Sequence, residues 1–247
     1  MNLNEFVESF ETLLKEQHLL DEQIRQGRIL ISQLTSSGAW FQDSLASLIL
    51  DPKWRKTQKP SIWPNEITLY RSANSEFVIL AYIWEPGMVD TIHDHGSWGV
   101  VGCLFGAMDE IKYHRLDDGS REGFANLSPH LPIVINPGQS TGILPLDRGI
   151  HRLGNVADGY SVTINVYGKS MRRGYIHFFY PDEMSVVPVY SHATQKAALA
   201  IRSLADIDAP WANDLLHSAL HEPLPDYLIR ECHRALSRRE GGKVSAA

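Results

Sequence analysis

The sequence has 247 residues and a formal net charge of −6 at pH 7. This length allows one large domain with a sizeable core. The acidic balance, without a block of basic residues, excludes an electrostatic footprint for nucleic acid or an anionic membrane surface. We therefore expect a small-molecule partner, and neither a nucleic-acid nor a membrane partner.

Cysteine usage and hydropathy indicate the compartment. The two cysteines, Cys103 and Cys232, cannot form a disulfide framework and are typical of a reducing environment. The longest apolar run, Phe77 to Trp84, is far shorter than the roughly 20 residues that span a bilayer. No basic segment follows Met1, so a targeting leader is not expected. These features predict a cytoplasmic protein.

Residues 1–64 are predicted to be a helical N-terminal extension. Apolar residues recur at three- and four-residue spacing from Leu3 to Leu34, which indicates an amphipathic helix or a helix pair. A further short helix is predicted over Trp40 to Leu50, ending before Pro52.

Residues 65–190 carry a different pattern, in which short apolar or alternating runs are separated by Gly, Pro, Asp and Asn. The predicted strands include Phe77–Trp84, Val100–Phe105, Ile133–Ile135, Tyr160–Tyr167 and Tyr175–Tyr180. Many short strands at this spacing predict a mainly β fold of the sandwich or barrel type.

Residues 191–247 return to a helical pattern and form a predicted C-terminal helical extension. The expected helices are Ala193–Ile207, Trp211–Leu220 and Tyr227–Arg238, and Arg239 to Ala247 are expected to be frayed. We expect the three segments to pack as one globular unit. A homodimer is one of the oligomeric states that the sequence leaves open.

Three histidines in the β-rich segment are the candidate metal ligands. His93 and His95 stand at positions i and i+2, so on a strand their side chains point to the same face. His151 precedes another predicted strand, and a closed barrel can bring such distant strands together. An isolated His-x-His pair is more often an ordinary polar part of the structure than a metal site. The residues around the pair must therefore show whether it binds a metal.

The wider pattern resembles the two motifs of the cupin superfamily. The first motif is matched by Gly87, His93, His95, Gly99 and Gly106 in spacing and order. The second is matched by Pro145, Gly149, His151 and Asn155. The resemblance implies a cupin-type double-stranded β-helix, or jelly-roll, barrel with α-helical extensions at both ends. It also implies one metal ion on His93, His95 and His151.

One departure from the cupin pattern bears on the chemistry. Gly99 stands where most metal cupins have a glutamate ligand. The predicted donor set is then three neutral imidazoles, which leaves positions open for substrate and for O2 or water. The charge of the metal stays uncompensated and favours an anionic ligand such as a thiolate.

A longer stretch, from about Tyr70 to Tyr167, resembles the cysteine dioxygenase-like thiol dioxygenases. The similarity is carried by His-Asp-His-Gly-Ser-Trp-Gly-Val-Val-Gly, by His-Arg-x-x-Asn and by Asn-Val-Tyr-Gly. It is nearer to the bacterial branch, which includes 3-mercaptopropionate dioxygenases. The resemblance implies an Fe(II) enzyme that oxidises a small thiol carboxylate, of the cysteine or 3-mercaptopropionate type, to its sulfinate with O2.

The same resemblance implies two candidate catalytic residues. Arg71 is near the position of an arginine that pairs with the substrate carboxylate, although an ordinary surface arginine at a strand edge is the competing interpretation. Tyr167 matches a tyrosine whose hydroxyl faces the iron, whereas a strand tyrosine is more often part of a core.

Two positions depart from the thiol dioxygenases. Gly99 aligns with the cysteine that can cross-link to the tyrosine, and Cys103 lies four residues on, roughly 13 Å away at the usual rise. No thioether is therefore expected. The Ser-x-His-x-Tyr relay becomes Thr163-Ile-Asn165-Val-Tyr167, and asparagine cannot titrate near neutral pH as histidine does.

Two other functions remain open. One is a metal cupin isomerase or hydrolase that uses Zn, Mn or Ni as a Lewis acid. The other is a non-catalytic small-molecule-binding cupin, which Asn165 favours because the titrating histidine is missing. Asp94, between the two histidines, is predicted to point to the opposite face of the strand.

Overall fold

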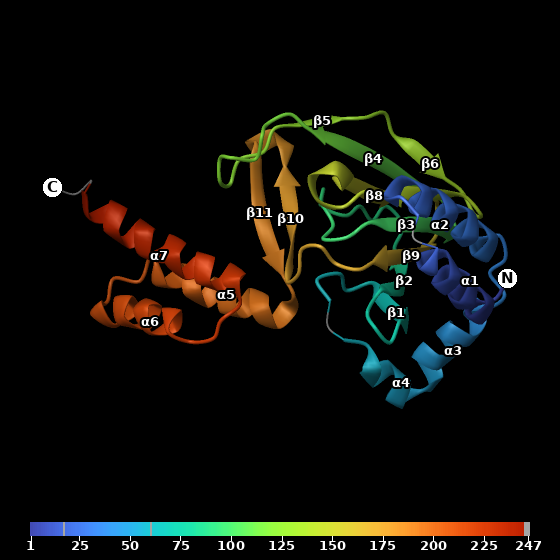
Figure 1. The fold of residues 1–247 in the computed structure, drawn as a ribbon, viewed down its shortest axis with the longest axis horizontal. Coiled ribbons are helices and arrows are strands. Elements are labelled where there is room, and N and C mark those ends of the chain that lie inside the picture. The colour runs from blue at the N-terminus through green and yellow to red at the C-terminus, as the bar shows by residue number, and fades with distance from the viewer. Residues whose placement is uncertain (17, 60, 245–247) are drawn as a thin grey trace. The chain divides into compact units, whose positions relative to one another are not determined.

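The computed structural model describes residues 1–16, 18–59 and 61–244. The chain divides into two compact units, residues 1–188 and residues 189–247, and each is described by itself. The prediction that the three segments pack as one globular unit stays a prediction. Figure 1 shows the elements of both units in chain order.

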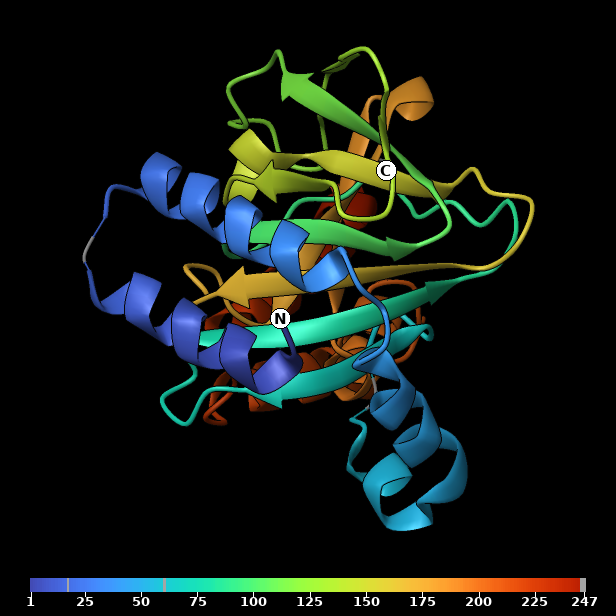
Figure 2. The ribbon, with the colours of Figure 1, turned by 90° about the vertical axis from the view of Figure 1, so that its right-hand side faces the viewer.

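Four helices form the N-terminal part of the first unit: α1 (Leu3–Lys15), α2 (Leu20–Thr35), α3 (Phe41–Leu50) and α4 (Pro52–Thr57). The first helix begins at a capping box in which Asn2 and Glu5 bond to each other's backbone N–H groups. Apolar side chains of α1 and α2 are buried in the same core as residues of the strands below them. Figure 2 shows both helices lying across one face of a sheet.

That sheet has five antiparallel strands. In spatial order they are β1 (Glu66–Arg71), β2 (Phe77–Trp84), β9 (Ser161–Gly168), β3 (Gly99–Phe105) and β7 (Ser140–Ile143). Residues at alternate positions face opposite sides, so β2 sends Ile79 and Ala81 toward the helices and Leu80 and Tyr82 away from them.

A second sheet of four strands is centred on β4 (Met108–Arg115). Its partners are β5 (Leu127–Pro129), β6 (Ile133–Ile135) and β8 (His151–Asn155). The strands β10 (Tyr175–Tyr180) and β11 (Ser185–Tyr190) form a two-stranded sheet.

One apolar core joins the two larger sheets. It contains Leu80 and Trp84 from β2, Val101 from β3, Met108 from β4 and Leu153 from β8. Two antiparallel sheets that share a core fit the cupin-type fold. Strand pairing among the described residues does not join them into a closed ring, so closure of the jelly-roll barrel stays a prediction.

Most predicted elements are confirmed to within a residue or a few. The strands over Phe77–Trp84, Ile133–Ile135 and Tyr175–Tyr180 have the predicted bounds. The third helix does end before Pro52, but another helix begins there. Asp51 accepts hydrogen bonds from the backbone N–H groups of Lys53 and Trp54, and proline at the first helical position has no N–H to leave unpaired.

The second unit contains α5 (His192–Leu204), α6 (Pro210–Leu220) and α7 (Asp226–Val244). Buried Glu231 on α7 accepts hydrogen bonds from Tyr190 and Arg202, both at 2.7 Å. Helix α7 continues past Arg239 to Val244, and fraying from Arg239 stays a prediction; residues 245–247 lie outside the described part. Among the described helices, none is long and apolar enough to cross a membrane.

Candidate metal centre

Backbone pairing brings His151 beside the His-x-His segment. The N–H groups of His93 and His151 each donate to the other residue's carbonyl, both at 2.9 Å. Directly opposed residues of an antiparallel pair place their side chains on the same face. His95 lies two residues after His93 and turns to that face as well.

The three imidazoles converge. Nε2 of His95 lies 2.9 Å from Nε2 of His151, and the ring centroids of the three are 4.7–5.1 Å apart. One ring nitrogen from each lies within 4.8 Å of the others, and the three residues are 3%, 9% and 1% exposed. This buried group could hold a metal ion.

Hydrogen bonds fix which nitrogens face one another. His93 donates through Nδ1 to the carbonyl of Thr91 at 2.8 Å, because a carbonyl can only accept. His151 donates through Nδ1 to Oε1 of Glu110 at 2.7 Å, and Oε2 of Glu110 accepts from Thr141 at 2.6 Å. Nε2 of His93 and Nε2 of His151 then carry lone pairs. With its proton on Nδ1, His95 would add a third Nε2 lone pair at the same place, which is the donor arrangement that a metal ion binds.

The protonation states suit a metal ion. Burial, followed by repulsion from His151, lowers the pKa of His93 to about 3. Burial and the neighbouring histidines hold the pKa of His95 well below its usual value. Burial alone would raise the pKa of Glu110, but the hydrogen bond from His151 and the charge of Lys112 lower it. The lowered pKa values keep His93 and His95 neutral and keep the carboxylate of Glu110, behind His151, ionised.

Asp94 points to the other face of the segment, as predicted. It is fully buried and accepts from both Nη1, at 2.9 Å, and Nη2 of Arg172. It also accepts from the backbone N–H of His177 at 2.8 Å. Burial would raise the pKa of Asp94, but His177 and Arg172 lower it to about 2. Ligand-type atoms of Asp94, Asp147 and His177 also lie close together, but Arg172 already supplies the positive charge there.

Tyr167 borders the three histidines. Its ring stacks on His95 with centroids 4.9 Å apart, and its hydroxyl accepts a hydrogen bond from Nδ2 of Asn165 at 3.0 Å. Gly99 lies opposite Tyr167 across the sheet, and a Cβ there would come within 2.7 Å of the tyrosine ring. Glycine at this position therefore makes room for the phenol. Burial raises the pKa of Tyr167, so the hydroxyl stays protonated near neutrality.

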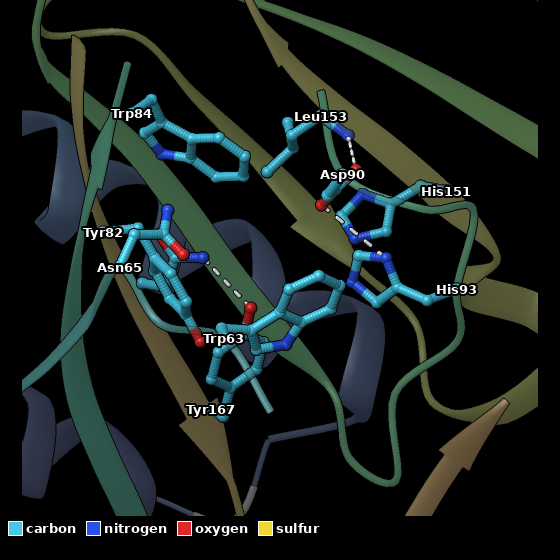
Figure 3. A pocket seen from close by; sticks show the side chains of 10 residues that line it. Trp63, Asn65, Tyr82, Trp84, Asp90, His93, His151, Leu153 and Tyr167 are labelled. Carbon is cyan, nitrogen blue, oxygen red and sulfur yellow. Dashed lines mark hydrogen bonds and ion pairs between the residues drawn. The ribbon is translucent and has the colours of Figure 1, made fainter. Parts of the chain in front are cut away.

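A small cavity of about 10 Å³ lies between the histidines and the aromatic residues. Figure 3 shows its lining, which consists of Trp63, Asn65, Tyr82, Trp84, Asp90, His93, His151, Leu153, Asn165 and Tyr167. The carboxyl group of Asp90 is 3.6 Å from Nδ1 of His93 and accepts the N–H of Leu153 at 2.7 Å.

Arg71 does not line this cavity. It is exposed at the end of β1 and borders a separate surface hollow of about 530 Å³. Arg173 and Tyr167 also border that hollow, so the tyrosine lies between the two spaces. The role of Arg71 toward a substrate carboxylate stays a prediction.

Sequence reasoning missed several residues of the site. Glu110, Arg172, Asn65 and His177 were not singled out. The sequence did contain a signal for Glu110. It lies two residues after the apolar Met108 on the same strand, so the two side chains share one face, and both are buried. Arg172 lies 78 residues from Asp94 in the chain and has no spacing signal.

No model of a known protein family matches the sequence. Solved structures give distant similarities. The cupin domain of an XRE-family transcriptional regulator from Enterobacter cloacae is 17% identical, with a TM-score of 0.30 over 42% of this chain and 94% of that chain. The DMSP lyase DddQ from Ruegeria pomeroyi is 14% identical, with a TM-score of 0.39 over 59% of this chain and 70% of that one.

A cupin barrel domain protein from Salinispora arenicola is 17% identical, with a TM-score of 0.30 over 44% of this chain and 81% of that chain. Each of these three TM-scores is below 0.5 and each identity is below 20%, so these similarities do not indicate a function.

Proposed function

We propose that the chain is an Fe(II)-dependent dioxygenase that binds its metal on His93, His95 and His151 and converts a small thiol carboxylate to its sulfinate. The observation that carries the proposal is the convergence of three imidazoles, which bind a metal as neutral donors, with no carboxylate in the group. Three neutral donors leave the full charge of a divalent cation for an anionic ligand, and a thiolate is the anion that soft, open iron sites accept.

An iron ion held there would supply the redox chemistry that joins both atoms of O2 to the substrate sulfur, so that RS⁻ and O2 give RSO2⁻. The protein supplies position and surroundings. Glu110 holds the orientation and tautomer of His151, and the carbonyl of Thr91 does the same for His93. Trp63, which packs on His93 with centroids 5.0 Å apart, limits access of water.

Tyr167 provides a hydroxyl donor beside the centre, because its ring stacks on His95 and it lines the same cavity. Its hydroxyl accepts from Asn165, so its own hydrogen is free to bond to an anionic ligand. Tyr167 also borders the hollow that contains Arg71, so a substrate bound beside the tyrosine could direct its carboxylate to that arginine.

The test combines metal analysis with O2 consumption. Protein purified without added metal is analysed for its metals, loaded anaerobically with Fe(II), and mixed with a panel of thiols while O2 uptake and sulfinate are measured. We expect one iron per chain and one O2 consumed per sulfinate formed. An iron-loaded protein that consumes no O2 with any thiol would contradict the proposal.

Asn165 favours a second candidate, a metal-containing binding module without turnover. Its side chain holds the Tyr167 hydroxyl but cannot relay a proton near neutral pH. Tight binding of a thiol to the metal-loaded chain, without product, would identify this function. A Zn, Mn or Ni cupin with Lewis-acid chemistry is the remaining alternative, and the metal analysis separates it from an iron enzyme.

A further inference from the structure

The cavity beside the histidines contains two unsatisfied hydrogen-bond acceptors. Oδ1 of Asn65 and Oδ1 of Asn165 are both buried without a partner, and both residues line that space. A buried polar atom left unpaired costs free energy, so such atoms mark a place where a ligand or water completes the structure. Asn165 is only 2% exposed.

Both amides are held in place by their surroundings. Asn165 lies in the middle of β9, between β2 and β3, and its Nδ2 donates to the Tyr167 hydroxyl at 3.0 Å. The backbone carbonyl of Asn65 accepts the backbone N–H of Ile83 at 3.2 Å, and the side-chain Nδ2 of Asn65 contacts Sδ of Met88 at 3.9 Å. In each amide the nitrogen has a partner, and the oxygen is left for the cavity.

The rest of the lining indicates the chemistry of the missing group. Trp63, Tyr82 and Trp84 present aromatic rings, and rings of this kind attract cations through their faces. Asp90 also lines the space. Among the lining residues there is no lysine or arginine, so nothing there would neutralise a carboxylate.

The volume of the cavity limits which chemical group it can hold. A volume of about 10 Å³ is close to the least that holds one water-sized group. A primary ammonium has that size and only donates hydrogen bonds, which matches two acceptors and an aromatic wall. The cavity is also lined by His93 and His151, so a group in it would belong to a ligand bound at the metal.

We propose that this cavity, which we name the ammonium subsite, binds the protonated amine of the ligand held at the histidine centre through Asn65, Asn165 and the aromatic rings around them. This rests on the proposed function and selects, among small thiols, those that carry an amine two carbons from the sulfur. The carboxylate, where the ligand has one, belongs to the separate hollow of Arg71.

The experiment measures binding, not turnover. The full-length chain, loaded with Fe(II) and kept free of O2, is titrated calorimetrically with matched pairs: 2-aminoethanethiol against 1-propanethiol and 2-mercaptoethanol, and cysteine against 3-mercaptopropionate. We expect each amine to bind at least about tenfold more tightly than its partner, as a hydrogen bond to a charged group would give. Asn65→Leu and Asn165→Leu should each reduce that preference to about threefold or less.

Asn126→Leu is the matched control, because Asn126 is exposed and borders neither the cavity nor the hollow of Arg71. It should keep the full preference. Metal content and melting temperature of each variant show that it is folded. A preference that survives in both cavity variants would mean that the amine binds the metal itself, and would overturn the inference. Equal affinities within each pair, as expected if the cavity only holds water, would also overturn it.

A further titration distinguishes failure of the proposed dioxygenase function from failure of the ammonium subsite. Propylamine, which has no sulfur, is titrated into the same metal-loaded protein and variants. Binding that is lost in Asn65→Leu and Asn165→Leu supports the ammonium subsite even if no thiol is ever oxidised. Tighter binding of 3-mercaptopropionate than of cysteine, with sulfinate formed from it, would support the dioxygenase and reject the subsite.

Discussion

Two groups of possible metal ligands lie on opposite faces of one extended segment. His93 and His95 join His151 on one face, and Asp94 joins His177 and Arg172 on the other. Both groups bring ligand-type atoms close together. They differ in charge: the histidine face has three imidazole donors and no cationic side chain among them, whereas on the Asp94 face Arg172 already neutralises the carboxylate.

The comparison shows that proximity of ligand atoms does not by itself make a metal site. A cation is required only where the donors are otherwise uncompensated. The Asp94 face has a structural role, because a buried ion pair fixes the chain between the two histidines and so holds their spacing. The two faces should therefore respond differently to the same kinds of change.

The largest difference is expected for metal affinity. His151→Ala removes one of three ligands and should lower metal affinity by more than 100-fold, to the point where the protein is isolated without metal. His177→Ala, on the other face, should retain metal affinity within about threefold. Anaerobic Fe(II) titration of both variants measures this. Equal loss in the two would show that the faces do not have separate roles.

The ion pair on the Asp94 face should contribute more to the free energy of unfolding than to metal affinity. Arg172→Met leaves Asp94 buried without its cation and should lower the free energy of unfolding by about 3 kcal/mol, the usual cost of breaking a buried pair. Adding Asp94→Asn to this variant should recover part of the loss. Urea unfolding of the metal-free protein measures both, and a change below about 1 kcal/mol in Arg172→Met would argue against this role.

The ion pair between Asp94 and Arg172 should also make the free energy of unfolding depend on pH in acid. The pKa of Asp94 is about 2 in the folded protein and near 3.9 in an unfolded chain. A lowered pKa stabilises the fold above the unfolded value, and that contribution, about 2 kcal/mol, is lost as pH falls from about 4 to 2. Chemical unfolding of metal-free Asp94→Asn over this range should show a flatter pH dependence than the native chain. Identical slopes would contradict the assignment.

Changing Glu110, which lies behind His151, should lower metal affinity less than removing a histidine ligand does. Glu110→Gln keeps the shape of the side chain but removes the charge that faces His151. It should weaken metal binding by about tenfold or more, the lower end of what such partners contribute. Thr141→Val, which removes only the bond to the far oxygen of Glu110, should cost less. A competition assay with a metal chelator ranks the two.

Tyr167→Phe should have the smallest effect on the metal and a selective effect on turnover. The ring still stacks on His95, so metal content should not change, but the free hydroxyl hydrogen is lost. We expect thiol-dependent O2 uptake to fall by a modest factor of roughly tenfold, as for loss of one hydrogen bond to a charged ligand. Loss of metal would show a structural role, and unchanged uptake would remove Tyr167 from the mechanism.

The elements could be predicted from the sequence because their periodicity is local. The i, i+2 spacing of His93 and His95 also placed Asp94 on the opposite face correctly. What lies behind the histidines could not be predicted in the same way. Glu110 and Arg172 reach the site through strand pairing and a loop far along the chain, and no local pattern encodes which distant partner a buried charge will have.

At Gly99 the sequence alone showed a departure from the cupin pattern, and the structure supplied the physical reason for it. Its alignment indicated the missing glutamate ligand, but not the reason. In the fold it faces Tyr167 across two paired strands, where a side chain would collide with the phenol ring.

The central claim is that one metal ion binds the histidine face, and X-ray absorption spectroscopy of the chain loaded with one equivalent of Fe(II) tests it most directly. We predict a first shell that includes three imidazole nitrogens at roughly 2.0–2.2 Å, with the multiple scattering of histidine rings, and its loss in His151→Ala. An all-oxygen shell that survives in His151→Ala, and disappears in Asp94→Asn, would contradict the claim.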